Sequence, residues 1–281
     1  MDKYSLSIAI PGTTGDGIKA CLWAGGIIRD IPTTVTFDRA IVKPGTKMGT
    51  MFGDPDYVYF VYSTQPFLKV DNHGRRITNE SSPYDFIVHA AARQADPAWH
   101  VIWDSTWRED VTRFATIGCS TLFLRPGSSH RPMGLDACEA KMESYVEDGY
   151  IIKADTLEEL AEGLMIDVDT FLATVEQYNS FYAAGKDTQF GKDPFRLSSL
   201  DTPPYYGMRS GTSPLCTLDG VLINTSYQAL DAQGEPIEGL YVVGNDAGGY
   251  FAGSYPNQAA GLAAGRGATA GMLCGRIVAS K

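Results

Sequence analysis

The chain has 281 residues, of which 44% are hydrophobic and 20% are charged, a composition typical of one large or two modest globular domains. Its net charge of −10, with no Lys/Arg cluster to offset it, argues against a nucleic acid partner, and no apolar run approaches the roughly 20 residues that span a bilayer. The five cysteines and four histidines lack the spacing of a disulfide framework or a zinc site, so we assign no metal.

The first part of the chain predicts a helix followed by short strands. A turn-forming cluster at 13–17 precedes the helix, which Thr14 or Asp16 could cap. Aromatic and β-branched residues favour the strands, the first two of which we expect to pair. In chain order we expect a helix at 18–28, strands at 57–62 and 67–71, a helix at 84–94 and a strand at 99–103.

The second part of the chain contains the strongest helical periodicity. Thr156 and Glu159 form a candidate capping box, and apolar residues recur at helical spacing beyond 169. We expect helices at 156–164 and 169–184, followed by a connection at 189–204. Short strands at 220–224 and 240–244 and a closing helix at 258–279 complete the chain. The helical middle separates two glycine-rich ends, which suggests that it is inserted into a domain formed by both ends.

Four segments together resemble the FAD-binding oxidoreductases of the fumarate reductase / succinate dehydrogenase flavoprotein superfamily. They lie at residues 14–26, at 74–80 (similar to the family's G-x-R-F-x-N-E), at 156–206 and at 239–275. The resemblance implies FAD as cofactor and a fold that combines α/β with α+β. A partial FAD-binding, Rossmann-like domain at 1–40 and 217–281 would be interrupted by an inserted α+β capping domain at 41–216.

The family's N-terminal dinucleotide fingerprint, G-x-G-x-x-G after a strand, is absent from this sequence. Its glycines let the backbone approach the cofactor's pyrophosphate at a helix N-terminus. We therefore expect a C-terminal portion of a longer or split protein, which would bind FAD weakly or not at all by itself. Besides a small-molecule substrate, the expected partners are the missing N-terminal half or an electron-transfer protein.

The resemblance implies that the segment at 244–249, which follows a buried strand and leads towards a helix, faces the flavin. Its glycines would let the backbone lie against a planar ring, and the helix would direct its positive end at the flavin carbonyls. The alternative is that these glycines only form tight turns. Asn245 stands where fumarate reductases usually carry a Glu. The resemblance suggests as cofactor-binding residues Thr14, Gly15, Asp16, Thr217, Gly244, Asn245, Asp246, Gly261 and Leu262.

The substrate side departs from fumarate reductases, according to the resemblance. Tyr84 replaces the proton-donating Arg, Tyr255 replaces a carboxylate-clamping Arg, and Cys216 replaces a substrate His. Residues 59–63 replace the family's Thr-Glu-x-x-Arg. A dicarboxylate would lose its bidentate Arg contacts, so fumarate is disfavoured as the substrate.

The same two tyrosines resemble those of 3-ketosteroid dehydrogenases, which makes Tyr84 and Tyr255 the candidate catalytic residues. A phenol with a pKa near 10 can donate a proton or a hydrogen bond at neutral pH. Cys216, Tyr59 and Tyr62 are candidate substrate contacts. Each has a plain alternative: Tyr84 could simply start a helix, Cys216 could be inert, and at least one aromatic residue of 59–62 is expected in the core, because strand residues alternate faces.

The sequence therefore predicts an FAD-dependent oxidoreductase that acts on a C–C bond beside a carbonyl, in an enone, enoate or ketosteroid-like substrate. The match to 3-ketosteroid dehydrogenases is incomplete, because Ala259 replaces a family glycine. Three alternatives stay open: an inactive fragment or half of a split flavoprotein, a fumarate reductase-like enzyme, and a binding module without redox chemistry.

Overall fold

The computed structural model describes residues 13–28, 34–48, 57–114, 122, 134–251, 255–256 and 261–280. They divide into two compact units, which are described separately below. Unit 1 is formed within residues 36–213, and unit 2 within residues 8–35 and 214–281. That unit 1 is a capping domain and unit 2 a cofactor domain stays a prediction. The predicted domain boundaries lie between residues 40 and 41 and between residues 216 and 217.

The sheet of unit 1 is built around its longest strand, β6 (Tyr205–Thr217). The strand order is β2-β1-β6-β4-β3, and β5 also pairs with β6. The other strands are β1 (Thr34–Val42), β2 (Tyr57–Tyr59), β3 (Leu68–Val70), β4 (Trp99–Asp104) and β5 (Ile151–Ala154).

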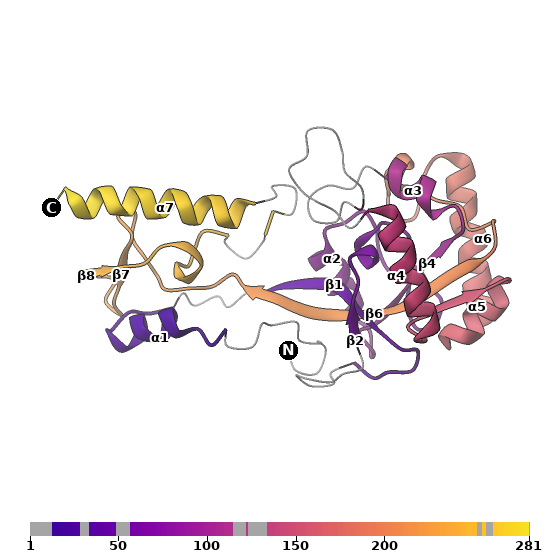
Figure 1. The fold of residues 1–281 in the computed structure, drawn as a ribbon, viewed down its shortest axis with the longest axis horizontal. Helices are drawn as coiled ribbons and strands as arrows, with labels where there is room; N and C mark the ends of the chain where they lie inside the picture. Colours follow the sequence, from indigo (N-terminus) through magenta and orange to yellow (C-terminus); the bar gives the residue numbers. More distant parts are fainter. Residues whose placement is uncertain are drawn as a thin grey trace. The chain divides into compact units, whose positions relative to one another are not determined.

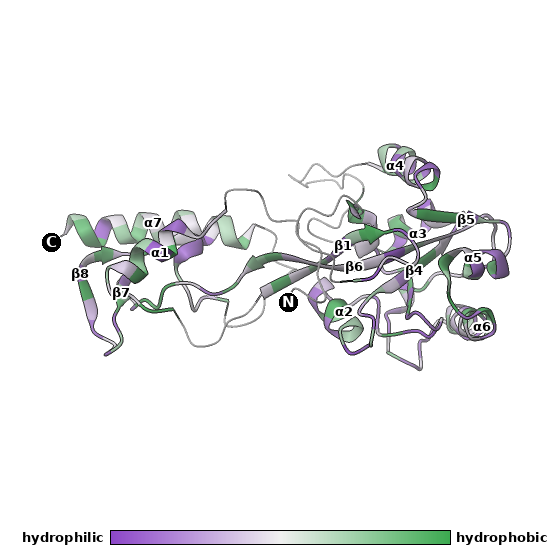
Figure 2. Ribbon diagram, turned by 90° about the horizontal axis from the view of Figure 1, so that it is seen from below, coloured by the Kyte–Doolittle hydropathy of each residue, from purple (hydrophilic) through white to green (hydrophobic). Residues whose placement is uncertain are grey.

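Helices cover both faces of this sheet, which explains why every residue of β4 is buried. Successive side chains of a strand point to opposite faces. Trp99, Val101 and Trp103 accordingly join a core cluster with α2 (Tyr84–Ala91), α3 (Trp107–Arg113) and α4 (Leu135–Glu147). Ile102 joins a second cluster with α5 (Leu157–Leu164) and α6 (Val168–Ala184), and Figure 2 shows α4 on the opposite side of the sheet from α5 and α6.

The helices α5 and α6 begin at side-chain caps. Thr156 Oγ1 accepts a hydrogen bond from Glu159 N at 3.1 Å, which confirms half of the expected capping box. The Glu159 carboxylate accepts from Asp155 N at 3.3 Å instead of from Thr156 N. Asp167 caps α6 in the same manner through Thr170 N at 2.9 Å. Such caps satisfy backbone donors that the helix itself leaves unpaired.

Unit 2 contains α1 (Asp16–Trp23), the hairpin of β7 (Gln228–Leu230) and β8 (Pro236–Tyr241), a 3₁₀ turn at Gly244–Asp246 and α7 (Leu262–Ala279). Figure 1 shows α1 and α7 on either side of this hairpin. The small core cluster consists of Cys21, Val221, Ala229, Val242 and Ala247. No helix in the described residues is both long and apolar enough to span a bilayer.

The structure corrects several expected elements. The strands expected at 57–62 and 67–71 do not pair with each other, because β2 pairs with β1 and β3 pairs with β4. Residues 61–64 form a 3₁₀ turn instead of strand. Gly15 occupies the N-cap of α1, while Thr14 Oγ1 donates to Asp16 Oδ1 at 2.7 Å, so the expected cap is wrong. Residues 220–224 make only isolated bridges.

Candidate functional site

The loop Gly244–Gly249 of unit 2 is fixed on one side by the segment that precedes β7. Val221 N donates to Asp246 O at 2.8 Å, and Gly248 N donates to Val221 O at 2.9 Å. A Cβ on Gly248 would lie 2.5 Å from the carbonyl oxygen of Gly220. Only glycine fits there, because the two backbones are already in contact.

Two of the predicted cofactor segments meet in unit 2. A Cβ on Gly17, in the first turn of α1, would lie 2.1 Å from Asp246 Oδ2, so α1 begins directly beside the loop. Thr14, Gly15 and Asp16 precede this contact and are exposed. The structure therefore brings the 14–17 and 244–246 segments together, as one binding surface requires.

The N-terminal end of α7 contributes the third predicted segment. Gly261 is its N-cap, with φ of +81°, and Leu262 is its first residue. No described side chain caps this end, so its backbone N–H groups can donate to a ligand, and the helix dipole favours negative charge there. A Cβ on Gly267 would lie 3.9 Å from the Cα of Gly244, which places α7 against the start of the loop.

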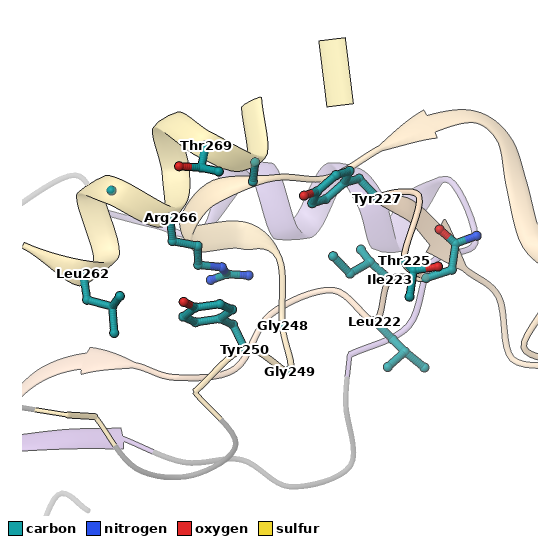
Figure 3. A pocket seen from close by; sticks show the side chains of 13 residues that line it. Leu222, Ile223, Thr225, Tyr227, Gly248, Gly249, Tyr250, Leu262, Arg266 and Thr269 are labelled. Atoms are coloured by element: carbon teal, nitrogen blue, oxygen red, sulfur yellow. The ribbon is translucent and has the colours of Figure 1, made fainter. Parts of the chain in front are cut away.

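A pocket of about 560 Å³ opens beside this loop (Figure 3). Its walls come from residues 222–225 and Tyr227, from Gly248, Gly249 and Tyr250, and from α7. The Arg266 guanidinium lies over the Tyr250 ring, 4.6 Å from its centroid. We did not identify Arg266 from the sequence. The available signal was that it is the only charged residue between Asp246 and Arg276.

Tyr255, the first candidate catalytic residue, belongs to an aromatic group in unit 2. Its ring lies 4.8 Å from that of Phe251, which lies 4.9 Å from that of Tyr250. Tyr255 is half-buried, and its neighbour Ala259 lies outside the described residues. The Cys216 and Thr217 side chains are exposed at the end of β6. Desolvation raises the pKa of the Cys216 thiol, so it is mainly uncharged at neutral pH.

Tyr84, the second candidate catalytic residue, is the first residue of α2 in unit 1. Its side chain is only 6% exposed. The ring meets that of Phe37 edge to face, with centroids 4.7 Å apart. Tyr84 does begin a helix, which is the alternative to a catalytic role considered above. Its ring is nevertheless packed against another aromatic ring. Its catalytic role stays a prediction.

The aromatic residues of 59–62 divide between the surface and the core. Tyr59 is 45% exposed, whereas Phe60 and Tyr62 are fully buried. Tyr62 stacks with Phe60 and Phe67 at centroid distances of 5.5 and 5.3 Å, and burial raises its pKa well above the ordinary value. The core placement expected for at least one of these residues is thus confirmed for Phe60 and Tyr62. A substrate could reach Tyr62 only if this core rearranged, while the role of Tyr59 stays a prediction.

Arg39 of β1 accompanies Tyr59 and was not identified from the sequence, because we did not predict β1. Its Nη1 donates to the Tyr59 hydroxyl at 2.7 Å, and its Nε donates to Thr64 Oγ1 at 2.9 Å. The guanidinium also lies 4.6 Å from the centroid of the Phe37 ring, which in turn packs on Tyr84. A buried arginine thus connects the surroundings of two predicted substrate-side tyrosines.

The motif at 74–80 forms a buried ion cluster in unit 1. Arg76 bonds the Glu80 carboxylate through Nε at 2.7 Å and that of Asp187 through Nη2 at 2.8 Å. Lys192 Nζ lies 3.3 Å from Glu80 Oε2 and donates to the Tyr178 hydroxyl at 2.6 Å. The guanidinium and the lysine hold the pKa of Glu80 below its ordinary value despite burial, which by itself raises it. The cluster joins segments distant in sequence, so we expect the removal of one partner, which leaves a buried charge unpaired, to destabilise the fold.

The residues of unit 2 fit the flavin part of an FAD molecule. Glycine backbone at the loop and the N–H groups in the first turn of α7, which no described side chain caps, offer donors to the flavin carbonyls, which gain negative charge on reduction. The family's G-x-G-x-x-G fingerprint for the pyrophosphate is absent from the sequence. Among the residues that the structure describes, no group of three His, Cys, Asp or Glu could hold a metal ion.

Comparison with known proteins identifies the family of this chain. The family model described as FAD binding domain matches residues 2–262. The vinyl phenol reductase of Lactiplantibacillus plantarum is 27% identical over 95% of this chain and 53% of its own length. The 4-oxocyclohexanecarboxylate 2-dehydrogenase of Sinomonas cyclohexanicum is 26% identical over 96% of this chain and 46% of its own length.

Among solved structures, the 3-ketosteroid Δ1-dehydrogenase of Sterolibacterium denitrificans matches with a TM-score of 0.67 at 24% identity. The match covers 99% of this chain and 49% of the dehydrogenase, and it shows a shared mixed α/β fold. This chain spans about half the length of the curated relatives it matches. It belongs to the FAD binding domain family, which implies FAD as cofactor, and it is related to the fumarate reductases and 3-ketosteroid dehydrogenases.

Proposed function

We propose that this chain is the C-terminal portion of an FAD-dependent oxidoreductase that acts on a C–C bond beside a carbonyl group. When bound, FAD supplies the ring that accepts or donates hydride. The observation that carries the proposal is the convergence in unit 2 of α1 at Gly17, the loop at Gly244–Asp246 and α7 at Gly267. In this proposal unit 2 belongs to a partial Rossmann-like FAD-binding domain, and unit 1 is its inserted α+β cap.

The two tyrosines would perform the proton chemistry. Tyr255 would donate a hydrogen bond to the substrate carbonyl and so polarise the adjacent C–C bond. Tyr84 would move the proton that accompanies hydride transfer. A neutral phenol suits both tasks at physiological pH, and a positioned general acid or base contributes about 10²–10⁴-fold to the rate.

An enone, enoate or ketosteroid-like compound is the substrate class that we propose. The relatives named above are, by name, a reductase of a vinyl phenol and a dehydrogenase of an oxocyclohexanecarboxylate. Both compounds combine a six-membered ring with a C=C or oxo group. Tyr59, which is exposed, would offer a planar substrate an aromatic surface.

Flavin absorbance tests the cofactor assignment directly. The purified chain would be mixed with FAD, freed of unbound cofactor and examined in the visible range. Retained flavin absorbance is the expected result for an enzyme with a competent site. The alternative of an inactive fragment, or of one half of a split flavoprotein, is favoured by the missing fingerprint and the partial coverage of relatives. Absorbance that returns only with the polypeptide carrying G-x-G-x-x-G would establish the split arrangement.

Paired substitutions in the complete protein test the catalytic roles. We expect Tyr255→Phe and Tyr84→Phe each to lower the turnover of an enone or enoate by about 10²–10⁴-fold while FAD stays bound. Tyr182→Phe is the control, because Tyr182 is 41% exposed on α6. Unchanged turnover in both variants would refute the assignment. Efficient turnover of fumarate would instead favour the fumarate reductase-like alternative.

A further inference from the structure

The loop Gly244–Gly249 has one side-chain tether to α7 that the proposed function does not use. We infer that Arg266 is a positioning residue, which holds this loop in the conformation that receives the flavin. The inference rests on the proposed function, because it assigns a role toward FAD. It requires no direct contact between Arg266 and the cofactor.

Arg266 contacts the loop at two successive points. Its Nη2 donates to the carbonyl oxygen of Ala247 at 2.7 Å. Its guanidinium lies 4.6 Å from the centroid of the Tyr250 ring and 5.8 Å from that of Phe251. Figure 3 shows the guanidinium next to the Tyr250 ring on the wall of the pocket. The residue thus binds the loop both before and after the two glycines Gly248 and Gly249.

Backbone contacts already fix one side of the loop, and the tether from Arg266 acts on the opposite side, which faces α7. Val221 pairs with Asp246 and Gly248, and Gly220 packs against Gly248. Those contacts hold the loop from the strand-like side. A charge-assisted hydrogen bond to Ala247 O, combined with stacking on Tyr250, holds it from the α7 side. A loop that is already ordered before FAD binds loses less conformational entropy on binding.

The guanidinium is suited to this role by its shape as well as its charge. It is half-buried, and desolvation lowers its pKa, although an arginine remains charged at neutral pH. Its planar face can stack on a ring while its edge donates to a carbonyl. A lysine would keep the charge and could still donate to Ala247 O, but it would lose the stacking. We therefore expect Arg266→Lys to restore part of the function that Arg266→Met removes.

Hydrogen–deuterium exchange tests the tether without any cofactor. We expect Arg266→Met to accelerate exchange in residues 244–250 about tenfold or more, the factor for a lost hydrogen bond to a charged group. Arg276→Met is the matched control, because Arg276 is exposed on the same helix. Equal exchange in the Arg266→Met variant and the unsubstituted chain would overturn the inference. General acceleration throughout unit 2 would also overturn it, because Arg266 would then support the whole unit.

An FAD titration tests whether the tether serves the cofactor. We expect the dissociation constant of FAD to rise about tenfold in Arg266→Met, to recover partly in Arg266→Lys and to stay unchanged in Arg276→Met. The titration uses the chain together with the fingerprint-bearing polypeptide if the chain alone retains no flavin. Faster exchange with unchanged FAD affinity would overturn the positioning role. Failure of every form to bind FAD would refute the proposed function, while the exchange experiment would still decide the tether.

Discussion

Unit 1 and unit 2 achieve order by different means. Unit 1 has two large core clusters and completely buries an ion cluster around Arg76. Unit 2 has a five-residue core cluster, and its loop is fixed mainly by backbone contacts at Gly220 and Gly248. Of the 18 residues of α7, only Ala270 and Cys274 are buried. Side chains thus stabilise unit 1, whereas backbone contacts that exclude side chains shape the candidate cofactor surface of unit 2.

The largest expected effect comes from opening the ion cluster of unit 1. Arg76→Leu would leave the buried carboxylates of Glu80 and Asp187 without their main partner. Breaking such a buried pair costs about 3–5 kcal/mol of unfolding free energy. Urea unfolding followed by tryptophan fluorescence would measure it, because Trp99, Trp103 and Trp107 all lie in the core of this unit.

The neighbouring Arg75 provides the control for this experiment, because its side chain is exposed. Arg75→Leu should unfold at nearly the urea concentration of the unsubstituted chain. An unchanged midpoint for Arg76→Leu would contradict the view that the cluster stabilises unit 1.

The pH dependence of unit 1 gives the second effect. Burial, and then the charge of Arg209, lowers the pKa of His100 from 6.5 to about 3 in the folded state. The unfolded chain therefore binds more protons between these values, and stability falls as the pH drops from 6.5 toward 3. At pH 4 the loss due to His100 would be on the order of 2–3 kcal/mol.

Chemical denaturation at several pH values would detect this loss. We expect His100→Gln to reduce the loss of stability between pH 6.5 and 4, and His89→Gln, at an exposed position of α2, to leave it unchanged. An identical pH profile for His100→Gln would show that other groups cause the acid sensitivity.

The backbone contacts of unit 2 give the third effect. A methyl group at Gly248 would lie 2.5 Å from the oxygen of Gly220, so Gly248→Ala must separate the two backbones. Overpacking of this kind costs about 1–3 kcal/mol. Hydrogen exchange at residues 220–222 and 244–249 should rise, while the tryptophan transition of unit 1 should not move. A shift of that transition would mean that the two units do not unfold independently.

The same contrast explains what could be predicted from the sequence. The helices α5 and α6 were predicted well, because their periodicity and the Thr156 cap are local signals. β1 and β6 were missed, because they bury polar residues such as Asp38, Arg39 and Arg209, whose partners are distant in sequence. Local pattern does not reveal such residues as strand, since tertiary contacts satisfy them.

The residues of the candidate site likewise divide into those that the sequence predicted and those that it did not. The glycine loop and Tyr255 were predicted as site residues because the resemblance aligns whole segments, and their roles stay predictions. Arg266 and Arg39 were not, because an isolated arginine gains its meaning only from the carbonyl, hydroxyl or ring that it contacts. The burial of Tyr62 likewise follows from a 3₁₀ turn that replaces the expected strand.

The smallest expected effect has the opposite sign and concerns the open face of α7. A Cβ on Gly271 would meet no described atom within 4 Å, and the residue lies in the helix interior. Gly271→Ala should therefore stabilise the helix by about 0.5–1 kcal/mol, because alanine loses less conformational entropy than glycine on folding. Slower hydrogen exchange in α7 would show the gain, and Gly275→Ala, equally open, should give a similar value. If either substitution instead destabilised the chain, polypeptide would have to pack closely against this face of α7 in solution. The contrast between the buried side chains of unit 1 and the exposed face of α7 in unit 2 would then be wrong.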